Sequence, residues 1–306
     1  MGYFTNAKGT TLTSLALSIG EDSDLLAAVA SNDDPDLLVP FTIADPGIVT
    51  IEQQPSSPSF PSSIASNRKA GLVITGMKPG QATLTTFIVN RLSDSTIARL
   101  QVNVADLVDS NIDIYYFGRF LVWRRSLPPS AAGSAAGSNF LLFDASSGLF
   151  SIASAQNQPD NGPLPEGTYR LKAELDPLQN SIDKANAALR NEPGPNGPIS
   201  NTRQGIQYLP IGGNPGSPLV APQWGSMRVR LEPTSASSQR GGFYLHNSAK
   251  GYTHGCVEVG SSLEPRRRDF FSLLVEFATS GNAKKSLMLK VKYRTPDTST
   301  RGNTKI

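Results

Sequence analysis

The sequence predicts a mainly β protein, with a β-sandwich in its N-terminal half and a β-rich second half that carries a few short helices. Short runs of β-branched and apolar residues, separated by turn residues, recur along the chain. Its 27 glycines and 23 prolines suit a protein built from many short strands and loops. Helical apolar spacing is limited to two stretches, at 176–192 and 264–281. A length of 306 residues allows two domains of ordinary size.

Strand patterns dominate residues 10–105. The stretches TLTSLALSI, PFTIADPGIVTIEQ, GLVITGMKPGQATLTTFIVN and TIARLQVNVAD read as strands joined by turns, with Gly76 and Gly80 supplying turn conformations. Residues 22–35 fit either a short helix or a loop. Several short strands with turn signals between them favour an antiparallel sandwich.

This first half resembles the group 2 bacterial Ig-like domains. The resemblance lies in DPGIVTIE followed by GLVITGMKPGQATLTTFIV, which match the family's strand and its following hairpin. It implies an Ig-like domain over residues 1–108, with SSPSFPSSIASNRKA as an inserted loop. Because no cluster of titratable residues occurs here, we expect this domain to bind or to act as a spacer.

From about residue 109 the pattern changes, and we expect a second domain over 109–295 and a disordered tail over 296–306. Strand patterns surround a Ser/Ala/Gly loop at 127–138 and a long Pro/Gly/Asn loop at 193–222. A helix is predicted to start at Asp176, with Pro177 as its first residue. A second helix is predicted within EPRRRDFFSLLVEFATSG, followed by a last strand.

Charge, cysteine count and hydropathy exclude several classes of protein. A net charge of +3, with no basic stripe, argues against a nucleic-acid partner. One cysteine forms no internal disulfide, and no apolar run is long enough for a membrane span. The start MGYFTNAKGTTLTSLALSIG lacks the features of a Sec signal peptide, so we expect synthesis in the cytoplasm without one.

All cysteine and histidine chemistry lies within eleven residues, from His246 to Cys256. A catalytic thiol needs an imidazole to take and return a proton, and backbone N–H groups for the oxyanion. His246 ends a strand pattern, and a hairpin-like return would bring it beside Cys256. Gly255 allows a tight backbone turn, and His254 adds a second imidazole two residues before the thiol.

Two other interpretations stay open for this window. A lone cysteine is often an inert core residue, and a lone histidine is often a satisfied polar group. Two histidines and one cysteine also suit zinc, although no fourth ligand is evident. We expect neither a metal nor another cofactor.

The window resembles the signature of the L,D-transpeptidase (YkuD-type) catalytic domain. FYLHN followed by YTHGCVEV matches its His, spacer and Thr-His-Gly-Cys order, NGPLPEGTYRL its upstream turn and strand, and LLFDASSGLFS its early hairpin. The resemblance covers about 112–294. The short His-to-Cys spacer and Glu258, where the family has a basic or amide residue, differ from the common enzymes. The spacer is closer to the type VI secretion effectors of this superfamily.

By position, the resemblance implies that Cys256 is the nucleophile and His246 the general base. His254 would support the turn, and the N–H groups around Gly255 would form the oxyanion hole. The backbone carbonyl of Asn247 would hold the imidazole tautomer.

The resemblance also implies substrate contacts from Tyr252, Thr253 and Glu258. Peptidoglycan stem peptides would be the substrate, with an amine, water or a D-amino acid as acceptor. A secretion-apparatus carrier and an immunity protein are the implied partners, and the target cell's periplasm is the implied place of action.

Two rival functions remain. The chain would be a non-catalytic structural or adhesion component of a phage or secretion apparatus if Cys256 carried no activity. A cysteine peptidase of another fold would need an orienting side chain for its imidazole, for which Asn247 is the only local candidate.

Overall fold

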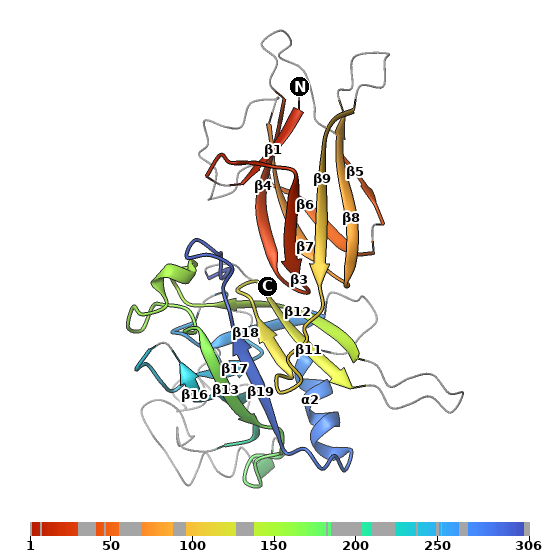
Figure 1. The fold of residues 1–306 in the computed structure, drawn as a ribbon. Coiled ribbons are helices and arrows are strands. Elements are labelled where there is room, and N and C mark those ends of the chain that lie inside the picture. Colours follow the sequence, from red (N-terminus) through yellow and green to blue (C-terminus); the bar gives the residue numbers. More distant parts are fainter. Residues whose placement is uncertain are drawn as a thin grey trace, which may run out of the picture. The chain divides into compact units, whose positions relative to one another are not determined.

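The computed structural model describes residues 2–6, 8–29, 41–45, 47–54, 69–87, 96–126, 138–181, 183–184, 204–209, 224–236, 238–248, 251, 253–262 and 269–302. The chain forms two compact units, Met1–Val108 and Asp109–Ile306. Both units are built mainly from strands, which confirms the mainly β fold class (Figure 1).

The N-terminal unit contains two sheets. One has the order β2-β1-β4-β7-β6 and the other β3-β9-β8-β5. Buried side chains such as Leu25 and Ile74 from the first sheet and Leu84 and Leu100 from the second form its core. The strands are β1 (Gly2–Asn6), β2 (Thr11–Leu12), β3 (Ser14–Ser18), β4 (Asp22–Val29), β5 (Phe41–Ala44), β6 (Val49–Gln54), β7 (Lys69–Gly76), β8 (Gly80–Phe87) and β9 (Thr96–Ala105).

Three expectations for this unit are corrected. The segment at 22–29, left open between helix and loop, is strand β4. The sheets are not purely antiparallel, because β3 and β9 run parallel. Gly76 is required by a close approach instead of a turn conformation, since a Cβ there would lie 2.6 Å from the carbonyl oxygen of Ser18. Gly80 does have a positive φ of 146°.

The second unit contains one ten-stranded sheet, in the order β14-β15-β17-β18-β12-β11-β10-β19-β13-β16. Its strands are β10 (Ile114–Tyr116), β11 (Phe120–Ser126), β12 (Ser138–Ser147), β13 (Gly167–Lys172), β14 (Ile206–Tyr208), β15 (Met227–Arg230), β16 (Glu232–Ala236), β17 (Tyr244–His246), β18 (Val257–Ser262) and β19 (Ser286–Val291). Alternate side chains of β19 are buried, as the sequence pattern of this strand predicts.

This sheet bends back on itself. Strands β15 and β16 are separated in sequence only by Leu231, yet they stand second and last in the strand order. The segment from 227 to 236 therefore pairs with β14 and β17 through its first half and with β13 through its second. Strands from both ends of the sheet thus enclose one apolar core.

Helix α2 (Phe270–Thr279) covers part of that core. Its N-cap is Asp269, whose carboxylate accepts from the Ser272 N–H at 3.0 Å. The Phe270 ring lies 5.6 Å from the Trp123 ring of β11 and 5.4 Å from the Phe143 ring of β12. The helix predicted in this part of the sequence is therefore confirmed. A short 3₁₀ helix spans Ala153–Ala155. The arginines at 266–268 lie outside the described residues.

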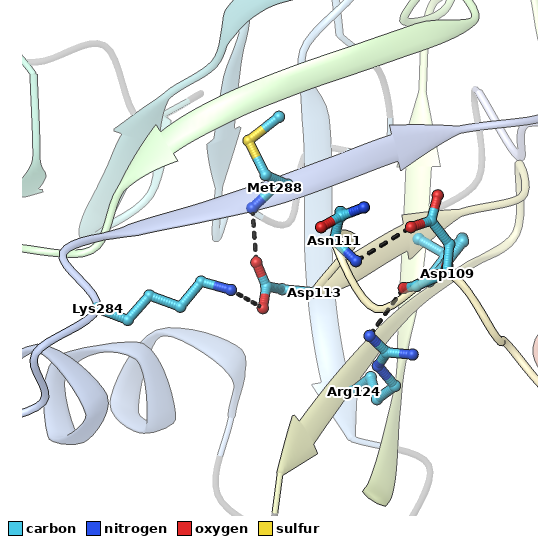
Figure 2. A network of polar contacts seen from close by, with 7 residues as sticks. Asp109, Asn111, Asp113, Arg124, Lys284 and Met288 are labelled. Carbon is cyan, nitrogen blue, oxygen red and sulfur yellow. Dashed lines mark hydrogen bonds and ion pairs between the residues drawn. The ribbon is translucent and has the colours of Figure 1, made fainter.

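A polar network fixes the start of the second unit to the centre of its sheet. The Asp113 carboxylate accepts from Lys284 Nζ at 2.6 Å and from the Met288 N–H at 2.8 Å (Figure 2). The Asp109 carbonyl accepts from Arg124 Nη2 at 2.8 Å. These contacts hold the entering chain where β10 pairs with β11 and β19.

The helix predicted from Asp176 does not form there. Residues 176–181 make turns, because the Asp176 carboxylate accepts from the Leu178 N–H and from Gln207 Nε2. Only 183–184 are helical among the described residues of this stretch. The predicted loop at 127–138 lies almost wholly outside the described residues, as does most of that at 193–222.

The tail is not disordered over 296–302. Ser299 and Arg301 form bridges to Ile152 and Ser147, and Thr300 is fully buried. Within the part of the chain that the structure describes, no helix is long and apolar enough to cross a membrane.

Candidate active site

Two parallel strands position the histidine and the cysteine. In β17 and β18, His246 is paired with Glu258, and Leu245 with Val257. Cys256 immediately precedes β18, and the alternation of this strand, extended back by one residue, predicts that it lies on the same face as Glu258 and His246. The pairing is parallel, so the expected hairpin-like return is wrong. The chain crosses over between the two parallel strands, which brings His246, at the end of β17, beside the start of β18.

Neighbouring β15 extends this face. Arg228 pairs with His246, and Arg230 with Tyr244. Since His246 also pairs with Glu258, a row of Arg228, His246 and Glu258 crosses three adjacent strands. All three are buried, at 3%, 2% and 0% exposure. Such a row of ionisable groups is uncommon in a protein interior and points to a functional site.

A serine connects the histidine to a buried carboxylate. Ser248 Oγ lies 3.0 Å from His246 Nδ1 and donates to Glu258 Oε1 at 2.6 Å. The Gly251 N–H and the Ser146 hydroxyl donate to the other Glu258 oxygen, at 3.0 and 3.3 Å. Three donors suit an ionised carboxylate, which only accepts.

This network assigns the tautomer of His246. Because Ser248 gives its one hydrogen to Glu258, its oxygen must accept from Nδ1, which therefore carries the ring proton. The other ring nitrogen, Nε2, is then the basic one. The role expected of the Asn247 carbonyl thus falls to the Ser248 hydroxyl.

The turn before β18 holds Cys256 by its backbone. The Cys256 carbonyl accepts from Ser147 Oγ at 2.8 Å and from Thr253 Oγ1 at 2.5 Å. Gly255 has a φ of 107°, and a Cβ there would lie 2.5 Å from Arg240 Nη2 and 2.7 Å from the Phe243 ring. Only glycine fits this position, as its place in the predicted turn requires.

Arg240 ties this turn to the loop at 156–163. Its guanidinium donates to the carbonyls of Gln156, Pro163 and Gly162, at 2.5, 2.9 and 3.0 Å, and to that of His254 at 3.2 Å. Burial lowers the pKa of Arg240, while Tyr169, Asp160 and Cys256 raise it. Arg240 and Cys256 therefore lie within electrostatic range of each other.

An aromatic and cationic stack adjoins the imidazole. The Trp224 ring lies 5.4 Å from both the His246 and Tyr244 rings. The Arg228 guanidinium lies 4.7 Å from the Trp224 ring centroid and 4.4 Å from that of Tyr244. Asn247 positions the start of this segment, because its side-chain oxygen accepts from the Ser226 and Met227 N–H groups.

The other predicted site residues contribute mainly to the turn and to its surroundings. His254 is exposed, and its Nδ1 contacts the Asp160 carbonyl at 2.5 Å, so it links two loops. Thr253 is 1% exposed and holds the turn, and Glu258 is fully buried. Substrate contacts from Thr253 and Glu258 stay a prediction. Tyr252 lies outside the described residues.

No metal centre is found among the described residues, where no group of three or more His, Cys, Asp and Glu side chains is arranged to hold an ion. The oxyanion role of the N–H groups around Gly255 stays a prediction. The Gly255 N–H itself points to Thr253 Oγ1 at 3.3 Å.

Sequence reasoning missed Ser248, Arg228, Arg240 and Trp224. The signals were slight: a Trp-Gly pair before the strand SMRVRLEP, and an arginine before the two glycines that precede FYLH. Ser248 lies within the window from His246 to Cys256, whereas Arg228, Arg240 and Trp224 are too far from Cys256 in sequence to suggest a contact without the fold.

No family model matches the sequence, and neither does any curated protein. Solved structures resemble it weakly. Domains 4 and 5 of the S-layer protein SbsC are 15% identical with a TM-score of 0.23, over 30% of this chain and 47% of that one. Amebosin is 18% identical with a TM-score of 0.20, over 30% and 88%. The chain thus spans about half of the first structure, and such likeness carries no argument about function.

Proposed function

We propose that this protein is a cysteine-dependent enzyme acting on the tetrapeptide stems of peptidoglycan, as an L,D-transpeptidase, an L,D-carboxypeptidase or a D-amino-acid exchange enzyme. The observation that carries the proposal is the β17–β18 pair, which sets a histidine of assigned tautomer on one face with the lone thiol. The choice of substrate rests on the resemblance of the His-Gly-Cys window to that family.

The residues supply the parts of an acyl transfer. Nε2 of His246 takes the proton of Cys256, and Sγ attacks the carbonyl of the third stem residue. The C–N bond to the terminal D-alanine breaks as the imidazolium returns its proton to the leaving amine. The resulting thioester passes to an amine or to water. Ser248 and Glu258 keep Nε2 basic at the start and stabilise the imidazolium that forms.

The wider setting belongs to the same proposal. The chain would be delivered by a secretion apparatus into a target cell's periplasm, where the stems are exposed. The N-terminal unit would dock or space the enzyme. An immunity protein would protect the producing cell.

The test is digestion of purified tetrapeptide muropeptides, read by intact mass. The wild-type protein is compared with the Cys256→Ala, His246→Asn and His254→Asn variants. We expect loss of one D-alanine, or its replacement by an added D-amino acid, with the wild type. Cys256→Ala should abolish the change and His246→Asn nearly so. His254→Asn should retain most activity, because that ring lies outside the site.

An unchanged muropeptide mass with wild-type protein, together with no covalent adduct from a carbapenem, would overturn the proposal. The non-catalytic structural role would then be favoured. Cleavage of ordinary L,L-peptides by the wild type and not by Cys256→Ala would instead favour the peptidase alternative.

A further inference from the structure

A buried guanidinium group beside Cys256 has an unpartnered nitrogen. Arg228 is 3% exposed, and its Nε donates to Gln207 Oε1 at 2.8 Å. Its Nη2 atom is buried and has no hydrogen-bond partner among the residues that the structure describes. Proteins rarely bury a charged donor without an acceptor, so an unfilled donor here points to a missing anion.

The position of this group is fixed from several sides. The rings of Trp224 and Tyr244 lie against it, at 4.7 and 4.4 Å from its central carbon. Gln207, which accepts from Arg228 Nε, is itself hydrogen-bonded to Asp176 at 3.0 Å. Arg228 is therefore held in a fixed position before any ligand binds.

A second cation with an open donor lies two residues along the same strand. Arg230 points to the same face of β15, and its Nη1 atom is also buried without a partner among the described residues. Burial lowers the pKa of Arg228, and Arg230 lowers it further, while Tyr244 and Cys256 raise it. A buried cation and a partly buried neighbour repel each other unless an anion lies between or beside them.

We propose that Arg228, with Arg230 beside it, binds the free carboxylate of the acyl donor, one residue beyond the carbonyl that Cys256 attacks. The open nitrogens of the two guanidinium groups supply one donor each for the two oxygens of a carboxylate. The site would thus select stems whose scissile bond lies next to a free C-terminus. The identity of the ligand as a stem peptide rests on the proposed function, whereas the anion-binding site itself does not.

The test compares two alkylating reagents that differ only in charge at the end remote from iodine. Iodoacetate and iodoacetamide both form an S–C bond to Cys256 with loss of iodide, and only iodoacetate carries a carboxylate. Rates are measured at about 0.15 M salt, where distant charges are largely screened. The proteins are wild type, Arg228→Met and, as a control, Arg170→Met, which removes an exposed guanidinium on β13.

In wild type we expect the iodoacetate-to-iodoacetamide rate ratio to exceed that of Arg228→Met by about tenfold or more. Arg170→Met should keep the wild-type ratio. If Arg228 only favoured the thiolate, both reagents would slow equally in Arg228→Met and the ratio would not change, which overturns the carboxylate site.

A second measurement serves if Cys256 reacts too slowly with both reagents for a rate to be measured. Sodium acetate, compared with acetamide and sodium chloride at equal ionic strength, should raise the thermal midpoint of wild type and not of Arg228→Met. No rise in wild type contradicts the proposal, even if Arg228→Met fails to fold. Because neither measurement needs turnover, the anion site and the enzymatic activity are judged separately.

Discussion

At the residue scale, the distinctive feature is the serine between the base and its carboxylate. Ser248 contacts both His246 Nδ1 and Glu258 Oε1. The negative charge thus acts on the ring through one hydroxyl. The arrangement keeps the neutral ring in a single tautomer, and it places a full charge within reach of the imidazolium when that forms.

The serine link predicts the effect of Ser248→Ala. The variant removes the acceptor of the Nδ1 proton and one donor to Glu258, so the ring loses its fixed tautomer. We expect kcat/KM on tetrapeptide to fall about tenfold to hundredfold, part of the 10²–10⁴ that a positioned base contributes. Ser146→Ala is the matched control. Its contact with Glu258 is longer, at 3.3 Å, and its effect should be several times smaller. Equal effects of both variants would contradict the relay.

Sequence alone could single out His246 and Cys256 but not the residues that contact them. His246 and Cys256 stand out because the chain has few residues of their kinds. Ser248 and Glu258 look unremarkable in sequence, since their roles depend on β17 and β18 running parallel in one register. Arg228 depends on a third strand, whose neighbours no local pattern reveals.

At the element scale, two expectations failed for different reasons. A strand end and a following turn lie near each other in either strand direction, so spacing could not distinguish a hairpin from a parallel crossover. The helix expected from Asp176 had sound local signals. Tertiary contacts override these signals. The Asp176 carboxylate accepts from Gln207 Nε2, and the Asp176 N–H donates to the Ile206 carbonyl.

The turn before β18 predicts a strong response to Gly255→Ala. A Cβ would meet Arg240 and Phe243 at a φ that side chains rarely adopt. We expect a loss of about 1–3 kcal/mol in the free energy of unfolding, measured with urea, and a large loss of activity. Gly241→Ala is the control, since nothing lies within 4 Å of its Cβ position, and it should change stability little. Similar losses in the two variants would contradict the packing argument.

Two buried tyrosines predict an alkaline limit to stability. Tyr169 and Tyr293 donate to the Pro165 and Leu164 carbonyls, at 2.7 and 2.6 Å. Burial raises the pKa of both phenols above the ordinary 10.0. A raised folded-state pKa gives stability that is fully present below pH 10 and is lost as pH rises from there toward the folded-state value.

The thermal midpoint of the second unit should therefore fall above about pH 10. Tyr293→Phe should fall less steeply over the same range, although it is less stable at pH 7. Parallel curves for the variant and wild type would show that other groups dominate.

At the scale of the whole molecule, the chain is two separate units with separate cores. Leu100 lies in the first and Leu289 in the second, each fully buried. The residues argued to do chemistry all belong to the second unit.

Because the two units have separate cores, a core substitution should destabilise only the unit that contains it. Leu100→Ala and Leu289→Ala should each cost about 2–5 kcal/mol in their own unit. Hydrogen exchange read by peptide mass should show faster exchange only in residues 1–108 for the first variant and only in 109–306 for the second. Faster exchange in both units from either change would show a single cooperative fold.

The contacts of residues 298–302 have a consequence for how the protein is made. Thr300 is hydrogen-bonded to Ser147 through both its backbone carbonyl and its hydroxyl. Ser147 Oγ in turn donates a hydrogen bond to the Cys256 carbonyl. Strand β19, also late in the chain, fills an interior place in the sheet. When Cys256 has been synthesised, β19 and residues 298–302 have therefore not yet been made. Synthesis proceeds from the N-terminus, so the surroundings of Cys256 stay incomplete until residues 286–302 have been made.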